Sequence, residues 1–410
     1  MIRSIQNVKD KLLVFPLLLY IISSYLCQET LISPKINSLL LLAFVGIAMI
    51  YSMFKAKTAN LNFSKWYFVF VCYALCSALL MTSNVFSTLY QMFVILILTF
   101  CFSITISNKE TLDLIIVTYV LSAVAMGILI MHYNPVYLLG NLDTINGARL
   151  GGEETGNANI FTALMMFSGV FASWLVLYNR NNVLRVIALL SLLFILYLMA
   201  LSGGRKTIIA LVACTIYFIW KKSGSSIKKR ILSIVMVSLT IYFSIYLLMN
   251  IQWIYDVIGY RFDGLIGFLG GNGESNVSSD NLRKKMIEIG LLGWTERPIF
   301  GHGLDSFKFY NAKVTGRMFY SHNNYVEILY DFGLLGFILY YAFLYKLYKR
   351  LVSMPPSYKI YSILGVGIII ELLFFDIGGI SYYSSNNMIM LCIATIISYS
   401  PRYYRIIPSN

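Results

Sequence analysis

Apolar stretches of about twenty residues recur along the whole chain, and they restrict its fold more than any other feature. A helix needs about 20 apolar residues to cross the hydrocarbon core of a bilayer, because it rises about 1.5 Å per residue. The chain is 58% hydrophobic and only 12% charged, which is unlike a soluble domain. The pattern therefore predicts an all-α fold, a polytopic membrane bundle of about twelve transmembrane helices. The predicted crossings lie near 12–31, 36–54, 64–82, 88–106, 112–131, 158–178, 184–201, 204–220, 231–250, 324–345, 358–376 and 384–400.

The net charge of +14 follows membrane topology rather than a nucleic-acid surface. If the N-terminus is cytoplasmic and each crossing changes side, the inner segments carry twenty of the 32 Lys and Arg residues. Cytoplasmic loops of membrane proteins show such an excess of basic residues. The distribution predicts that both termini are cytoplasmic, and it does not indicate a nucleic-acid partner.

Only two segments on the predicted outer side are long, a first outer loop at 132–157 and a large outer loop at 251–322. We expect residues 1–410 to form a single integral membrane domain that carries both loops. The larger loop is too long to be only a connector, so it is expected to have structure of its own. From Leu282 to Trp294 its apolar residues have helical spacing, which predicts an amphipathic helix on the outer membrane surface.

His322 stands at the outer end of the predicted span that begins near Asn324. Imidazole is the side chain best able to accept a proton near neutral pH, so His322 is the candidate general base. The alternative is an interfacial histidine that only hydrogen-bonds a loop. His132 and His302 have weaker cases for a catalytic role, and we interpret both as structural.

A polar stripe follows this histidine along one helix face, because Asn323, Glu327 and Asp331 stand at positions i, i+4 and i+8. By rise alone Asp331 would lie about 13 Å below the histidine. An acid at that depth should face the bundle interior, where it supports either function or polar packing. Gly333 and Gly336 on the same helix would permit close approach of neighbouring helices.

Four arginines on the predicted outer side are candidates for binding an anion. Arg149 lies in the first outer loop, Arg205 in a tight turn between two spans, and Arg283 and Arg297 in the large loop. A guanidinium stays charged and can bind phosphate through two hydrogen bonds. The sequence contains no Asp-x-Asp or His-Glu-x-x-His spacing, so arginines are the expected means of neutralising a pyrophosphate. The alternative for each is an interfacial arginine that meets lipid headgroups.

The stretch 281–338 resembles the O-antigen ligase and polymerase superfamily of bacterial membrane proteins. Members have an arginine, then a Pro-x-x-Gly-x-Gly segment, then a His-Asn pair that opens a helix carrying Gly-x-x-Gly. The tryptophan that often follows the arginine is missing here. A turn and the start of a span earlier in the chain also resemble the family pattern. The matching residues are Arg283, Pro298, Gly301, Gly303, His322, Asn323, Gly333 and Gly336, with Ser202-Gly-Gly-Arg205 and Gly156-Asn157-Ala158-Asn159 as the earlier pieces.

The resemblance implies a GT-C-like, metal-independent glycosyltransferase without a cofactor. It would use glycan linked to undecaprenyl pyrophosphate at the outer face of the cytoplasmic (inner) membrane. In that interpretation His322 is the base, the four arginines bind pyrophosphate, and the polar stripe supports the histidine. No separate nucleophilic carboxylate is apparent, which favours a single inverting displacement.

Three functions remain open on the sequence. A polymerase would join lipid-linked repeat units into O-antigen, capsule or exopolysaccharide, and a ligase would transfer the glycan to lipid A core. The polymerase is favoured because polymerases are more numerous and diverse. A polysaccharide flippase or other transporter is the alternative from another class. The partners implied are the lipid-linked glycan and the bilayer, with a chain-length regulator and a flippase as further candidates.

Overall fold

The computed structural model describes residues 2–28, 31–55, 60–79, 85–133, 150–152, 155–224, 228, 231 and 278–403. Regular structure in these ranges consists of α-helices and one 3-10 helix, with no strand. The predicted all-α fold is therefore confirmed. The chain divides into two compact units, Met1–Tyr51 with Asn108–Gly273 and Ser52–Ser107 with Glu274–Asn410. Arg149 lies outside the described residues, as do 134–149 of the first outer loop and 251–277 of the large one.

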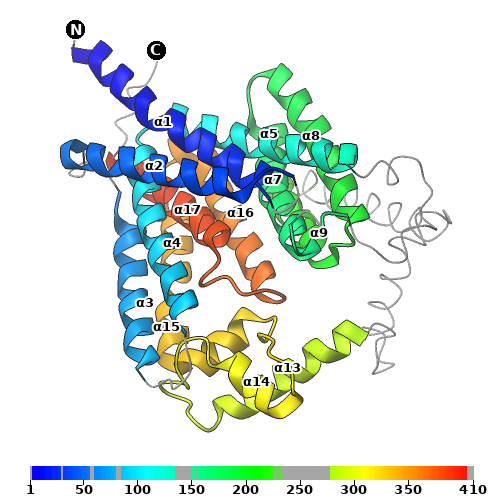
Figure 1. The fold of residues 1–410 in the computed structure, drawn as a ribbon. Helices are drawn as coiled ribbons and strands as arrows, with labels where there is room; N and C mark the ends of the chain where they lie inside the picture. Colours follow the sequence, from blue (N-terminus) through cyan, green and yellow to red (C-terminus); the bar gives the residue numbers. More distant parts are fainter. Residues whose placement is uncertain are drawn as a thin grey trace, which may run out of the picture. The chain divides into compact units, whose positions relative to one another are not determined.

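The first unit is built around α7, which is buried along most of its length and packs against α5, α8 and α9 (Figure 1). The Asn157 side chain begins α7 by accepting a hydrogen bond from the Asn159 amide, as an N-cap residue does. The helices of this unit are α1 (Ile2–Leu26), α2 (Pro34–Lys55), α5 (Lys109–Tyr133), α7 (Ala158–Tyr178), α8 (Asn182–Leu201) and α9 (Arg205–Lys222).

The second unit contains the described part of the large outer loop. Its long helix α15 packs against α3, α16 and α17, and α13 and α14 pack on α15 (Figure 1). The elements are α3 (Asn62–Ala78), α4 (Phe86–Thr105), α13 (Ser278–Trp294), α14 (Phe307–Thr315), α15 (Asn324–Val352), η4 (Pro356–Tyr358), α16 (Lys359–Asp376) and α17 (Ser385–Tyr403).

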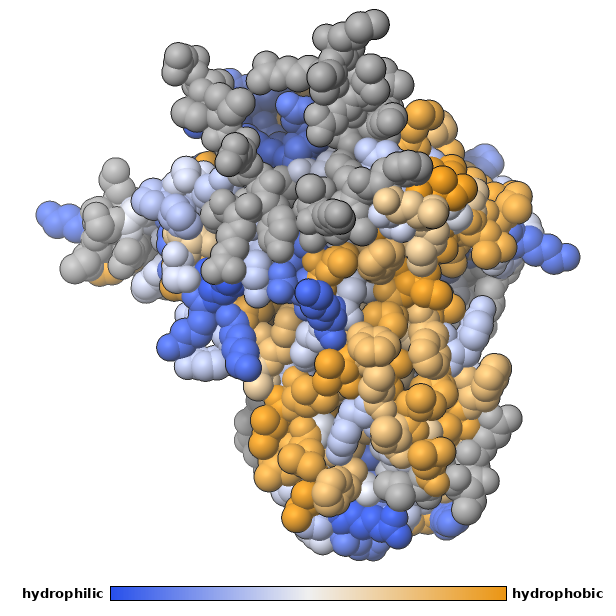
Figure 2. Space-filling view, turned by 90° about the vertical axis from the view of Figure 1, so that its left-hand side faces the viewer, coloured by the Kyte–Doolittle hydropathy of each residue, from blue (hydrophilic) through white to orange (hydrophobic). Residues whose placement is uncertain are grey.

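Within the described residues, seven helices are long and apolar enough to cross a membrane. Every predicted crossing coincides with a helix except 231–250, of which only Ile231 is described. Exposed apolar side chains are frequent on the helices, and Figure 2 shows a wide hydrophobic face. An apolar surface of this extent is what a lipid-facing protein presents. The chain is a multi-pass helical membrane protein.

The helix α15 is not straight, because Gly333 inside it has φ 62° and ψ −165°. A straight helix would place Asn324 and Tyr341, which are 17 residues apart, about 25 Å from each other. Yet the Asn324 amide nitrogen donates to the Tyr341 hydroxyl at 3.0 Å, and the rings of Tyr325 and Tyr341 stack with centroids 5.0 Å apart. The segment before Gly333 therefore folds back toward the segment after it. The predicted span 324–345 therefore consists of two helical segments joined at Gly333, and Asp331 lies in the first of them.

Candidate functional site

The segment Pro298–Gly303 fills the break in α15. At the break, carbonyl groups before Gly333 and amide groups after it lose their partners within the helix. This segment, which begins as a turn at 298–300, satisfies both sets, since its amides donate to the carbonyls and its carbonyls accept from the amides. Donor first, the hydrogen bonds are His302 N to Tyr330 O (2.9 Å), Gly303 N to Asp331 O (2.8 Å), Leu334 N to Pro298 O (2.8 Å) and Leu335 N to Ile299 O (3.2 Å).

Two glycines allow this hydrogen-bonded contact between α15 and the Pro298–Gly303 segment, which we call the backbone joint. A Cβ at Gly301 would lie 2.5 Å from the carbonyl of Asp331, and a Cβ at Gly333 would lie 2.4 Å from the carbonyl oxygen of Ile299. Both glycines also have positive φ, 72° and 62°. The Pro-x-x-Gly-x-Gly segment and the first glycine of Gly-x-x-Gly are therefore two halves of one structure. The close approach expected at Gly333 is made by the backbone of Ile299 and Gly301.

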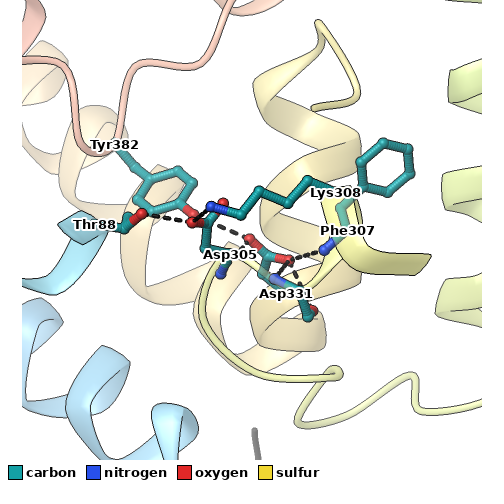
Figure 3. A network of polar contacts seen from close by, with 7 residues as sticks. Thr88, Asp305, Phe307, Lys308, Asp331 and Tyr382 are labelled. Carbon is teal, nitrogen blue, oxygen red and sulfur yellow. Dashed lines mark hydrogen bonds and ion pairs between the residues drawn. The ribbon is translucent and has the colours of Figure 1, made fainter. Parts of the chain in front are cut away.

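Asp331 lies fully buried on the first segment of α15 and caps the start of α14 (Figure 3). A carboxylate at this end of a helix satisfies amides that have no helical acceptor and favours the helix dipole. These hydrogen bonds give Asp331 a structural role, because they hold α14 and the turn before α17 onto α15. The donors are Asp305 N (3.0 Å), Ser306 N (3.0 Å), Ser306 Oγ (2.9 Å), Phe307 N (3.1 Å) and the Tyr382 hydroxyl (3.0 Å).

A second buried acid, Asp305, extends this network toward α4. Its carboxylate accepts a hydrogen bond from the Thr88 hydroxyl of α4 and forms an ion pair with Lys308 (Figure 3). Asp305 has φ 55°, a left-handed conformation that residues with a Cβ seldom adopt. The ordered polar network thus fixes the connection between the Pro298–Gly303 segment and α14.

His322 is half-buried and immediately precedes α15, where Asn323 is the N-cap. The Asn323 side chain accepts a hydrogen bond from Val326 N at 3.1 Å. His322 has φ 57°, which costs a residue with a Cβ roughly 1 kcal/mol or more. Its ring centroid lies 4.1 Å from that of Tyr320, with the two rings tilted by 47°. The His-Asn pair therefore combines a helix cap with a histidine held in an unfavourable backbone conformation.

Glu327 is fully buried beneath this turn, and its Oε2 accepts a hydrogen bond from Ser321 N at 2.7 Å. The Ser321 hydroxyl donates to Asn323 O at 2.8 Å, and the Asn323 amide lies 3.2 Å from the same hydroxyl oxygen. Glu327 thus contacts the backbone before the histidine, and the Ser321 hydroxyl contacts the backbone after it.

Arg283 lies on α13 and completes the group of polar residues around the start of α15. Burial has the largest effect on the Tyr320 hydroxyl and raises its pKa. The positive charge of Arg283 lowers this pKa, and the charge of Glu327 raises it. Gly290 and Gly293 of α13 lie against Val326 and Tyr330 of α15, so Arg283, two turns earlier in α13, lies toward the start of α15. Arg283, His322 and Glu327 are therefore at the same end of α15.

The amphipathic helix predicted at Leu282–Trp294 is present as α13, but its apolar face packs on protein rather than on lipid. Met286 and Ile289 are 3% and 8% exposed and form a cluster with Phe307 of α14 and Tyr330 of α15. The sequence pattern identified the buried face but not its partner. Packing against α14 and α15 keeps Arg283 near the start of α15.

The other arginines are placed differently. Arg297 is exposed beyond the far end of α13, and the eleven residues from Arg283 to Trp294 alone correspond to about 16 Å of helix. Arg297 is therefore not beside His322. Arg205 begins α9 in the first unit, where the Ser202 hydroxyl donates to Ala158 O at 3.4 Å. The Ser-Gly-Gly-Arg turn thus lies against the start of α7, which carries the Gly-x-x-Asn match.

The environment of His302 supports its structural interpretation. Its Nε2 is hydrogen-bonded to Gly293 O at 2.8 Å, and its ring stacks on Tyr330 with centroids 4.4 Å apart. His132 is exposed near the end of α5. Neither histidine belongs to the group around His322.

Sequence reasoning missed Tyr320, Ser321 and Tyr382. Ser321 directly precedes His322, so its closeness to an N-cap was an available signal. Tyr382 had no such signal, because it is 51 residues from its partner Asp331.

Comparison with protein families gives a match for the central part of the chain. Residues 189–341, from within α8 to within α15, match the family model described as O-Antigen ligase. The matched range contains Arg205, Arg283 and His322. The comparison with curated proteins gives no match. Members of this family are glycosyl-transferring enzymes of the ligase and polymerase type. The match confirms the predicted resemblance: residues 189–341 are similar to the O-antigen ligase/polymerase superfamily.

Proposed function

We propose that the protein is a polysaccharide polymerase. It joins repeat units linked to undecaprenyl pyrophosphate by metal-independent, inverting glycosyl transfer at the outer face of the cytoplasmic membrane. The observation that carries this proposal is the placement of His322, Tyr320, Arg283 and Glu327 at the start of α15, within the family match. A half-buried imidazole and an arginine at the same end of one helix suit a reaction that needs both a proton acceptor and a counter-charge for phosphate.

The proposed reaction is a single displacement. A hydroxyl oxygen of the acceptor sugar attacks the anomeric carbon of the donor glycan, and its proton passes to the imidazole of His322. The bond between the anomeric carbon and the pyrophosphate oxygen breaks, and undecaprenyl pyrophosphate leaves with the bonding electrons. Negative charge grows on the leaving group, so a guanidinium beside it stabilises the transition state more than the ground state.

Arg283 is the arginine for which the structure gives the best support, because it is at the same end of α15 as His322. Arg205, described in the other unit, remains a predicted pyrophosphate ligand at the start of α9. The exposed position of Arg297 beyond α13 makes it a weaker candidate. Metal independence also remains a prediction.

Polymerisation is proposed over ligation because polymerases are the more numerous and diverse branch of the superfamily. A strain that lacks the gene distinguishes the two activities. Loss of a polymerase leaves single repeat units attached to the acceptor, whereas loss of a ligase leaves long undecaprenyl-linked chains and bare lipid A core. The second pattern would contradict the proposal. Unchanged lipid-linked and finished glycans would exclude both activities.

A further inference from the structure

The turn that carries His322 is an enlarged form of the capping box. In an ordinary box, the N-cap side chain binds the amide three residues later, and a glutamate at that third position binds the N-cap amide in return. Here the first half is normal, since Asn323 accepts from Val326 N. The glutamate lies one residue further along, at Glu327, and it binds Ser321 N, two residues before the N-cap.

His322 is the residue that this enlarged box encloses. The amide before it is bound to Glu327, and the amide after it is bound to the Ser321 hydroxyl, which itself donates to Asn323 O. The peptide that follows the histidine and the peptide between Tyr320 and Ser321 are therefore both hydrogen-bonded, while the histidine takes the left-handed φ of 57°. Such conformations persist where the surrounding structure imposes them, and they concentrate at functional sites.

The second carboxyl oxygen of Glu327 indicates that more than helix capping is involved. Oε1 is fully buried, and no group among the described residues hydrogen-bonds it. A box needs only one acceptor oxygen, and a buried polar atom without a partner destabilises the fold. Glu327 raises the pKa of Tyr383, an effect second only to that of burial. The hydrogen bond from Ser321 N places the carboxyl group under the turn that holds the histidine.

We propose that Ser321 and Glu327 are positioning residues that hold the His322 imidazole in its reactive orientation through the flanking backbone. This inference rests on the proposed function, in which His322 is the base. A displacement of a catalytic group by about 1 Å can lower the rate about 100-fold without weakening substrate binding. Loss of the box should therefore lower kcat and leave KM nearly unchanged.

A double-mutant cycle tests this proposal on full-length purified protein, with lipid-linked repeat units extracted from a strain that lacks the gene as substrate. Glu327→Ala should lower kcat about 10- to 100-fold, and Ser321→Ala should lower it in the same direction. Glu327→Gln should restore most of the activity, since its amide oxygen still accepts from Ser321 N. Glu288→Ala, which removes an exposed carboxylate of α13, should have no effect.

The decisive comparison is Glu327→Ala made in the His322→Ala background. If Glu327 acts only through His322, the double variant is no less active than His322→Ala alone. The proposal would be overturned if the two substitutions lowered kcat independently, so that their effects multiplied. It would also be overturned if Glu327→Ala left the activity unchanged or altered only KM. If Glu327→Ala does not fold, the same cycle with Ser321→Ala decides. Near wild-type activity of His322→Ala would instead overturn the proposed function itself.

Discussion

Replacing Gly333 with alanine tests the joint between α15 and the Pro298–Gly303 segment. Gly333 has φ 62° and ψ −165°, a region that only glycine occupies readily. Forcing another residue there costs on the order of 1–3 kcal/mol. The new Cβ would also lie 2.4 Å from Ile299 O and 2.6 Å from Gly301 N. These are backbone atoms, so they cannot move without disturbing the joint.

The magnitude follows from the hydrogen bonds that the joint contains. Separation of α15 from the Pro298–Gly303 segment would break at least the bonds from Leu334 N to Pro298 O and from Leu335 N to Ile299 O. Each of these bonds is worth about 1 kcal/mol. Together with the conformational strain, the loss comes to roughly 3–5 kcal/mol. At about 2–4 °C per kcal/mol, the melting temperature should fall on the order of 10 °C.

Gly316→Ala is the matched control. Gly316 also has positive φ, 73°, but a Cβ there would meet nothing within 4 Å, so only strain of about 1 kcal/mol applies. Thermal unfolding of both detergent-purified variants, followed by fluorescence size-exclusion chromatography, gives the comparison. Equal melting temperatures for the two variants would refute the backbone joint.

The remaining predictions concern the buried acid, the arginines and the topology. Asp331→Asn places an amide NH₂ where amide and hydroxyl donors now point, so the protein should lose about 1–3 kcal/mol of stability; unchanged thermal unfolding would contradict the capping role. Arg283→Lys keeps the charge but loses the planar fork, so transfer should fall sharply in a purified assay while Arg297→Lys stays active. EDTA should have no effect in the same assay, and strict magnesium dependence would count against arginines as the groups that neutralise the pyrophosphate. A cysteine at exposed Lys313, in a cysteine-free background, should react with an impermeant maleimide in intact cells; labelling only after permeabilisation would invert the proposed topology.

The fold was predictable to the extent that it depends on local hydropathy. Long apolar stretches form helices because a chain in lipid must satisfy its own backbone groups, and every predicted crossing within the described residues is helical. The break in α15 was not predictable from this pattern. The sequence Asp331-Phe332-Gly333-Leu334 reads as continuous helix, and the break forms because the distant Pro298–Gly303 segment supplies other hydrogen-bond partners.

The site was predictable in its residue types and less so in their roles. His322 and Arg283 were selected by their chemistry, and in the structure the His322 ring contacts Tyr320 while Arg283 lies on α13, which packs along α15. Asp331 was selected as a polar residue in a span, but the helix that it caps lies 24 residues earlier in the chain. Helical spacing alone cannot separate such a capping acid from Glu327, four residues away on the same face.

The most direct test measures two properties of purified His322→Ala: binding of the undecaprenyl-pyrophosphate-linked repeat unit, and extension of that unit into polymer. Loss of a general base costs about 10²–10⁴-fold in rate. The arginines remain in this variant, so donor binding should match that of the wild type while polymer formation falls by that factor. Polymer formation at near the wild-type rate would show that His322 is not the base and would contradict the proposed mechanism.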